Sequence, residues 1–316
     1  MFEVFAYNEK NDIIEKLELD AKSIKKASWI RIVDPNPEKL KMLSERTGIP
    51  QEELQESLEE EERPKVSAGK FLEIIYRAPY TIDSELETLP VYFYMFEDKV
   101  ITIEKKPLKG ISDLSKKMSQ NKSKFLFKKG EAHFIYHIMD LINDDFLSKI
   151  DKIASKIDLY ENFSRKELTI KDIEKVYEQS VTLSFFNQAL IANVEVLNTL
   201  KKGYFKLIKS KDKTLFEELY YNVLQILDTE KIQREAVTNL INVHSIITST
   251  RLNNFMKKLT TIALIVAIPT LFSSIYGMNF LHIPLYNHPY GFYIITGMMM
   301  LITLFSVYMA KEKKWL

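Results

Sequence analysis

The chain has 316 residues, of which 46% are hydrophobic and 28% charged, a composition that predicts a folded protein with room for two domains. Its 44 basic and 43 acidic side chains nearly balance, so it lacks the strongly basic face of a nucleic-acid-binding protein, and we expect no nucleic-acid partner. The absence of cysteine excludes disulfides, thiolate metal sites and cysteine nucleophiles, which fits a protein that faces the cytosol.

Residues 1–107 are expected to form a cytosolic α/β domain. The N-terminus has no basic segment followed by an apolar run, so no secretory signal is predicted. Runs of β-branched and aromatic residues predict strands at 2–7, 29–33, 71–77, 91–96 and 100–104. Helices are expected at 37–47 and 51–62, the first with Asn36 as its N-cap and Gly48 as its stop.

Residues 108–211 are expected to be a helical region, because glycine and proline become rare and apolar residues recur every three or four positions. A short amphipathic helix is predicted at 111–127. Two longer helices, at 131–165 and 169–202, should pack as an antiparallel pair, the second ending at Gly203.

A single helix is predicted from about residue 212 to Tyr276, interrupted only by Pro269. At about 1.5 Å per residue, roughly 65 residues extend about 95 Å, so this helix must leave the globular domain. We expect a stalk over 212–258 that continues directly into a first membrane span at 259–276.

No Asp, Glu, Lys or Arg occurs between Leu259 and Ala310. Two apolar segments lie in this stretch, 259–276 and 291–310, and each covers the roughly 30 Å of a bilayer core as a helix. The alternative, a buried core hairpin, fits less well because a core helix of that length normally carries charge on its solvent face. A multi-pass protein of the plasma membrane is therefore predicted.

Lysines flank the membrane spans on one side, before the first span and in the tail 311–316. Because basic residues are enriched on the cytoplasmic side, both chain termini are expected in the cytosol. The lysines of this basic ring are Lys257, Lys258, Lys311, Lys313 and Lys314.

The loop 277–290 between the spans opens with Gly277, Met278 and Asn279. A Gly-Met-Asn string after one span and before a second, with a long helix upstream and a basic C-terminal end, resembles the CorA family of magnesium channels. The resemblance covers the whole chain. It implies an α+β multidomain membrane protein that assembles as a funnel-shaped homopentamer, with the first span lining a central pore.

The resemblance implies that Gly277, Met278 and Asn279 form the selectivity filter. Mg²⁺ sheds its octahedral water shell reluctantly, so a filter should accept hydrogen bonds from the water shell through neutral oxygens. A ring of Asn279 amides and Gly277 carbonyls would provide such oxygens, while Met278 packs. We also expect Gly277 to let the chain turn without steric penalty where the helix ends. In the alternative interpretation the three residues merely cap the helix.

Pore-lining positions follow from helical spacing, because residues three or four apart share a face. The resemblance implies that Asn253 is a polar ring at the cytosolic mouth, Met256 and Leu259 an apolar constriction that closes by dewetting, and Thr270 a second polar ring. Ala267 departs from the family pattern, in which methionine is common there, and Pro269 is displaced by one position. The whole predicted stripe comprises Asn253, Met256, Leu259, Ala263, Ala267, Thr270 and Ser274.

The resemblance also implies a regulatory cation site between neighbouring cytosolic domains. Alignment by the family pattern places Asp83 and Glu218 at its two acidic positions. Two carboxylates brought together repel each other unless a cation lies between them, so intracellular Mg²⁺ would hold the ring closed. In the alternative interpretation they are two solvated surface acids.

Other polar clusters favour ordinary structural roles. His133 and His137 have a spacing that can bind metal, but no further ligand is apparent and interior packing is favoured. The acidic run 59–62 is typical of a solvated helix end. His282 and His288 occupy an outer loop that has no acid to concentrate cations.

The predicted function is magnesium uptake through a channel, with cobalt and nickel as further possible cargo and Mg²⁺ also as the regulatory ion. No phosphate-binding glycine loop, activated nucleophile or catalytic acid pair is found, so no enzymatic activity is expected. Two alternatives stay open, a zinc transporter of the same superfamily and a membrane-tethered cytosolic sensor.

Overall fold

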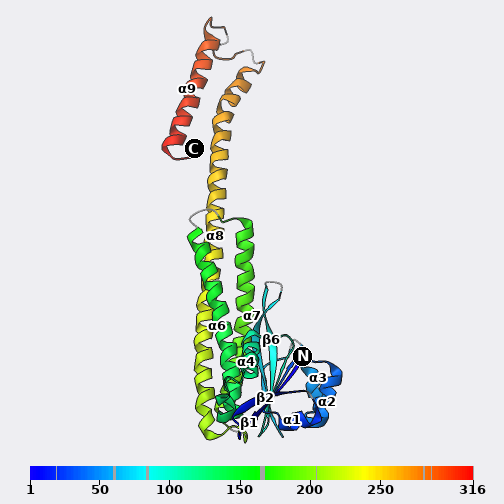
Figure 1. The fold of residues 1–316 in the computed structure, drawn as a ribbon. Coiled ribbons are helices and arrows are strands. Elements are labelled where there is room, and N and C mark those ends of the chain that lie inside the picture. The colour runs from blue at the N-terminus through cyan, green and yellow to red at the C-terminus, as the bar shows by residue number, and fades with distance from the viewer. Residues whose placement is uncertain are drawn as a thin grey trace. The chain divides into compact units, whose positions relative to one another are not determined.

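The computed structural model describes residues 1–18, 20–59, 62–82, 85–163, 168–203, 205–279, 282–285 and 287–315 (Figure 1). These residues form two compact units, Met1–Leu240 and Ile241–Leu316. Asp83, Glu60 and Glu61 lie outside the described residues. The first unit contains a sheet with its covering helices, and the second contains two apolar helices.

The sheet of the first unit has seven strands in the order β2-β1-β3-β7-β6-β5-β4. Only the central pair β3–β7 is parallel, with Trp29 opposite Val100, and every other pair in the described sheet is antiparallel. The strands are β1 Phe2–Asn8, β2 Ile13–Leu17, β3 Trp29–Val33, β4 Lys65–Ala68, β5 Leu72–Ile82, β6 Glu85–Met95 and β7 Val100–Glu104.

Helices cover both faces of this sheet. The small helices at the N-terminal side are α1 Ala21–Lys26, α2 Pro37–Thr47 and α3 Gln51–Glu56. The later helices are α4 Lys109–Ser119, α5 Phe125–Lys129, α6 Glu131–Phe163, α7 Ile170–Lys201, the 3₁₀ turn Ser210–Asp212 and α8 Lys213–Tyr276, which continues into the second unit. Side chains of the strands alternate between the two faces, so each face has its own core.

One core lies between the sheet and α1 to α3, and the other lies between the sheet and the long helices. In the first, Leu40 and Leu54 pack with Tyr92 of β6. In the second, the hydroxyl of the buried Tyr76 donates to Asn143 of α6 at 2.8 Å. Helices α6 and α7 therefore pack directly on the sheet that precedes them in the chain.

Several predicted elements are confirmed by the structure. The strands 29–33 and 100–104 and the helix 37–47 have the predicted bounds. Asn36 caps α2 by accepting from the Lys39 amide at 3.0 Å, and Gly48 ends it in the left-handed conformation. The predicted helix pair is present as α6 and α7, and Gly203 follows α7 with a φ of 62°.

Other predictions are wrong in extent. The helix predicted at 51–62 ends at Glu56, where the amides of Leu58 and Glu59 donate to carbonyls only three residues back, each at 2.9 Å. The helix predicted at 111–127 is two helices, since Asn121 and Ser123 adopt positive φ between α4 and α5. Strands β5 and β6 are longer than predicted because they form a two-stranded extension that pairs from Leu72 with Met95 to Ile82 with Glu85.

A buried charged network joins the sheet to α4. Arg31 of β3 is 2% exposed, and its guanidinium donates to Glu104 of β7 through Nε at 2.7 Å and Nη2 at 3.0 Å. It also donates to Glu3 of β1 at 3.1 Å and to the Ser112 hydroxyl at 2.8 Å, while Ser115 donates to Glu3 at 2.6 Å. Each charge thus has a partner of opposite sign, which buried ions require.

Arg31→Ala should destabilise the protein by about 3–5 kcal/mol, because it leaves the buried Glu104 carboxylate without its cation and Glu3 with Lys16 alone. A matched control is Lys16→Ala, whose ammonium lies 2.8 Å from Glu3 but whose side chain is 49% exposed. Its loss should cost about 1 kcal/mol or less. Thermal unfolding of the full-length protein in detergent measures both, and equal losses in the two variants would contradict the assignment.

Candidate ion pathway

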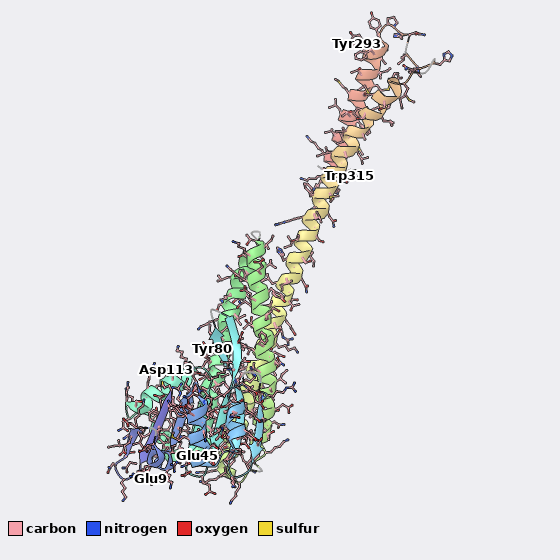
Figure 2. The ribbon with its side chains drawn as sticks, turned by 90° about the vertical axis from the view of Figure 1, so that its right-hand side faces the viewer. Glu9, Glu45, Tyr80, Asp113, Tyr293 and Trp315 are labelled. Carbon is pink, nitrogen blue, oxygen red and sulfur yellow. The ribbon has the colours of Figure 1, made fainter. Side chains whose placement is uncertain are left out.

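The second unit contains the end of α8 and the helix α9, Gly291–Glu312. Both helices are long and apolar enough to cross a membrane, with mean hydropathies of 1.9 and 1.8 in their most apolar windows. Most of their large apolar side chains are exposed on the single chain. Figure 2 shows Tyr293 at the start of α9 and Trp315 just beyond its other end. Both helices thus present apolar surface outward, as membrane spans do.

One face of α8 packs toward α9. Thr261 is 5% exposed, and with Ile265 and Ile268 it lines a cavity of about 300 Å³ that Phe305 of α9 closes from the other side. Near the other end, the Ser273 hydroxyl lies 3.8 Å from the Met299 sulfur. These contacts fix which side of α8 the second span covers.

The predicted pore stripe lies on the opposite face of α8. At about 100° per residue, Ala263, Ala267 and Thr270 lie roughly half a turn from Thr261 and Ile265. All seven residues of the stripe are exposed in the single chain. Helix α9 therefore leaves the stripe open, as a pore-lining face requires, although a single chain encloses no pore.

Hydroxyl groups on the stripe are arranged as acceptors. Thr270 donates to the Val266 carbonyl at 2.8 Å, and Ser274 donates to the Thr270 carbonyl at 2.8 Å. Because each hydroxyl hydrogen is used inside the helix, the oxygen lone pairs remain available. Such oxygens suit the water shell of a cation.

The Gly-Met-Asn segment ends α8. The amide of Gly277 donates to Ser273 O at 2.9 Å and that of Met278 to Ile275 O at 3.2 Å, so the last turn tightens before an exposed Asn279. We expected Gly277 to provide a backbone turn that other residues adopt only with strain. The structure does not show this, because Gly277 is not among the positive-φ glycines of the described chain. A Cβ at Gly277 would lie 3.3 Å from the carbonyl oxygen of Ser273, which already accepts from the Gly277 amide.

The lysines of the basic ring lie at one end of the α8–α9 pair. The ammonium of Lys257 lies 5.8 Å from the ring centroid of Trp315, within cation–π range. Lys314 adopts a φ of 53°, and the Trp315 amide returns to the Ala310 carbonyl at 2.8 Å, which folds the tail back toward α8. Lys258, Lys311 and Lys313 are exposed nearby in the chain.

The two predicted regulatory acids have different outcomes. Asp83 lies outside the described residues, and Glu218 is exposed on α8. Burial, with the carboxylates of Asp140 and Glu218, raises the pKa of Tyr136 to about 12. Burial, Asp144 and Glu218 together raise the pKa of Asp140. Glu218 thus lies among acids of α6 that sequence reasoning missed, although Asp140 and Asp144 are one helical turn apart.

The histidine pair is part of the packing of α6. Both rings are half-buried, and His133 stacks on Tyr136 with centroids 5.5 Å apart. Burial, with the charge of Lys129, lowers the pKa of His133, and burial with His133 itself lowers that of His137. In the part of the chain that the structure describes, no group of three or more acids or histidines is placed to hold a metal ion.

Comparison with known proteins assigns this architecture. The sequence profile of the family described as CorA-like Mg²⁺ transporter protein matches residues 25–311. The chain belongs to this family. The cobalt/magnesium transport protein CorA of Methanocaldococcus jannaschii is 32% identical over 289 residues, which cover 91% of each chain. The protein of the same name from Thermotoga maritima is 26% identical and covers 92% of this chain and 83% of its own.

A solved CorA has the same fold along its whole length. The complete structure of the CorA magnesium transporter from Methanocaldococcus jannaschii superposes with a TM-score of 0.90 at 30% identity, covering 100% of this chain and 99% of that one. The α/β unit, the long helix and the two apolar C-terminal helices are therefore the family architecture.

Single cysteines can map the open face of α8, since the chain has none of its own. Ala263→Cys, on the stripe, should react with a charged water-soluble thiol reagent roughly tenfold or more faster than Ile265→Cys, because the reactive thiolate forms in water and is disfavoured in apolar surroundings. Labelling rates of the reconstituted protein give the comparison. Equal rates would show that the stripe does not face water.

Proposed function

We propose that this CorA-family protein conducts Mg²⁺ passively into the cell, with Co²⁺ and Ni²⁺ as further cargo. The observation that carries the proposal is the uncharged stripe on α8 that faces away from α9 and leads to Gly277, Met278 and Asn279. The relatives named for cobalt and magnesium transport support the same cargo. A channel of this kind requires no catalytic group.

Conduction requires several copies of the chain. Two spans cannot enclose a path, so the stripe becomes a pore only when copies form a ring with α8 inside and α9 outside. We propose a homopentamer in the plasma membrane, with both termini in the cytosol next to the lysines of the basic ring. The proposed segments are the cytosolic α/β domain 1–107, the helical region 108–211 and the stalk 212–258. They are followed by the spans 259–276 and 291–310, the outer loop 277–290 and the tail 311–316.

The filter is proposed to select a hydrated ion. A ring of Asn279 side-chain oxygens, supported by Gly277 carbonyls, accepts hydrogen bonds from the coordinated water of Mg²⁺, which keeps its shell. Thr270 and Ser274 repeat the arrangement deeper in the pore, because their hydroxyl hydrogens are already used within the helix. Asn253 lines the cytosolic mouth, and Met256 and Leu259 form an apolar constriction that closes by dewetting.

Asn279→Ala should reduce Mg²⁺ influx into proteoliposomes by about tenfold or more, since one hydrogen bond to a charged partner contributes about 1.5–3 kcal/mol and tenfold is about 1.4 kcal/mol. The matched control is Asn287→Ala, an exposed asparagine of the same outer loop, which should conduct normally. A fluorescent Mg²⁺ indicator inside the vesicles reports the flux.

The same assay separates the competing functions. A zinc transporter would carry Zn²⁺ faster than Mg²⁺ in the unsubstituted protein, and a cytosolic sensor would show no flux in any form. Unchanged Mg²⁺ influx in Asn279→Ala would contradict the filter while leaving transport intact.

We propose that intracellular Mg²⁺ closes the channel by binding between Asp83 of one subunit and Glu218 of its neighbour. The position of Glu218 supports the proposal. It is exposed, and it adds to an acidic surface with Asp140 and Asp144 that repels itself unless a cation is bound. Release of the cation would loosen the ring and let α8 move the constriction.

Glu218→Ala should raise the internal Mg²⁺ concentration that half-closes the channel by about fivefold or more, the usual size of an allosteric coupling. The control is Glu217→Ala, which removes an adjacent exposed carboxylate and should leave closure unchanged. Patch-clamp currents at stepped internal Mg²⁺ measure the shift. An identical response in both variants would favour two solvated acids with no regulatory role.

A further inference from the structure

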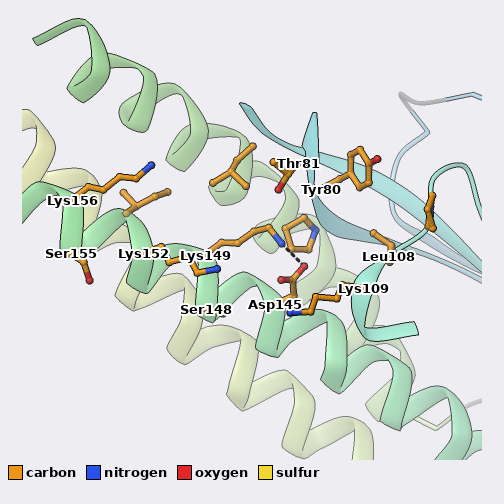
Figure 3. Close-up of a pocket in the computed structure, with 14 residues that line it drawn as sticks. Tyr80, Thr81, Leu108, Lys109, Asp145, Ser148, Lys149, Lys152, Ser155 and Lys156 are labelled. Carbon is orange, nitrogen blue, oxygen red and sulfur yellow. Dashed lines mark hydrogen bonds and ion pairs between the residues drawn. The ribbon is translucent and has the colours of Figure 1, made fainter. Parts of the chain in front are cut away.

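A pocket of about 660 Å³ lies in the first unit between α6, the start of α4 and the end of strand β5 (Figure 3). This volume is within the usual range of about 300–1,000 Å³ for small-molecule sites. It is formed within one chain and is separate from the ion pathway on the end of α8. We call it the lysine pocket, after Lys109, Lys149, Lys152 and Lys156, which line it.

The lysines come from two elements that are distant in the sequence. Lys149, Lys152 and Lys156 follow each other at three and four residues on α6, so they share one face. Lys109 begins α4, and the neighbouring Gly110 lies so close to α6 that a Cβ there would be 3.2 Å from the Leu141 side chain. The close contact of α4 with α6 brings the fourth lysine to the same pocket.

The positive charge of the pocket is only partly neutralised. Asp145 is the one acidic residue among the described lining residues, and it is paired with Lys149, whose side chain is only 14% exposed. Within the described part of the chain, no carboxylate forms an ion pair with Lys109, Lys152 or Lys156. Asp144 and Asp151 line an adjoining hollow, which shares Lys152 with the lysine pocket. Like charges one helical turn apart repel, so a bound anion would relieve this arrangement.

The opposite wall of the pocket is apolar and aromatic. Figure 3 shows Tyr80 and Thr81 on β5 across from the lysines of α6. Pro79, Leu86 and Leu108 complete this wall. One side of the cavity therefore suits phosphate groups, and the other suits a flat ring that packs on Tyr80.

We propose that the lysine pocket binds a phosphorylated ligand of nucleotide size. Its phosphates lie against Lys109, Lys149 and Lys152, and its ring packs against Tyr80. The volume argues against inorganic phosphate alone, which would occupy a small part of the cavity. The inference is independent of the proposed transport, because the pocket holds none of the filter or pore residues.

Isothermal titration calorimetry of the full-length protein in detergent tests the proposal, with ATP, tripolyphosphate and inorganic phosphate as probes in magnesium-free buffer. ATP should bind most tightly and inorganic phosphate most weakly. Lys109→Gln with Lys152→Gln should weaken ATP binding by about tenfold or more, since charge-assisted hydrogen bonds are the strong ones. The control, Lys41→Gln with Lys171→Gln, removes two exposed lysines outside the pocket and should leave binding unchanged.

A second variant separates the two walls. Tyr80→Ala should weaken ATP binding but leave tripolyphosphate binding unchanged, and the retained tripolyphosphate binding shows that the pocket is still folded. Failure of ATP to bind the unsubstituted protein would overturn the proposal. So would equal ATP affinity in the pocket and control lysine variants, or inorganic phosphate binding as tightly as ATP.

Discussion

The proposed ion pathway depends on one constraint, the absence of charged side chains from Leu259 to Ala310. In a membrane each backbone polar group must find its partner within the protein, and helices provide this. The hydroxyls follow the same rule, since Thr261, Thr303 and Ser306 donate to carbonyls four residues earlier, each at 2.8 Å. In the proposed pore a cation would therefore meet only neutral oxygens along this part of the chain, which favours an ion that keeps its water.

The same constraint gives α8 two distinct faces. No charged side chain distinguishes one side of this part of α8 from the other. The two faces differ instead in their packing, because Thr261 and Ile265 pack toward the second span, α9. The stripe through Ala263 and Thr270 is not covered by α9 and stays exposed on the single chain. In this way the two-helix unit divides its surface between helix packing and the proposed pore, and neither function needs an ionisable group.

Local patterns predicted the long helices and the central strands, because 3.6-residue and two-residue periodicities act within one element. They missed β2 and β4, whose short sequences are mostly polar or exposed, and the six-residue α1. The Gly-Met-Asn filter is contiguous and could be proposed from sequence. The Arg31 network and the lysine pocket could not, since only tertiary packing brings Arg31 to Glu104 and places Lys109 and Lys152 on one pocket.

The parallel pairing of β3 with β7 has a consequence for biosynthesis. The two strands at the centre of the sheet are joined by about seventy residues of intervening chain, so β3 gains its second neighbour only after Glu104 has left the ribosome. Until then the apolar faces of the first strands are exposed and need protection from aggregation. The first apolar span follows more than a hundred residues later, so every strand of this sheet has been synthesised well before the apolar hairpin emerges.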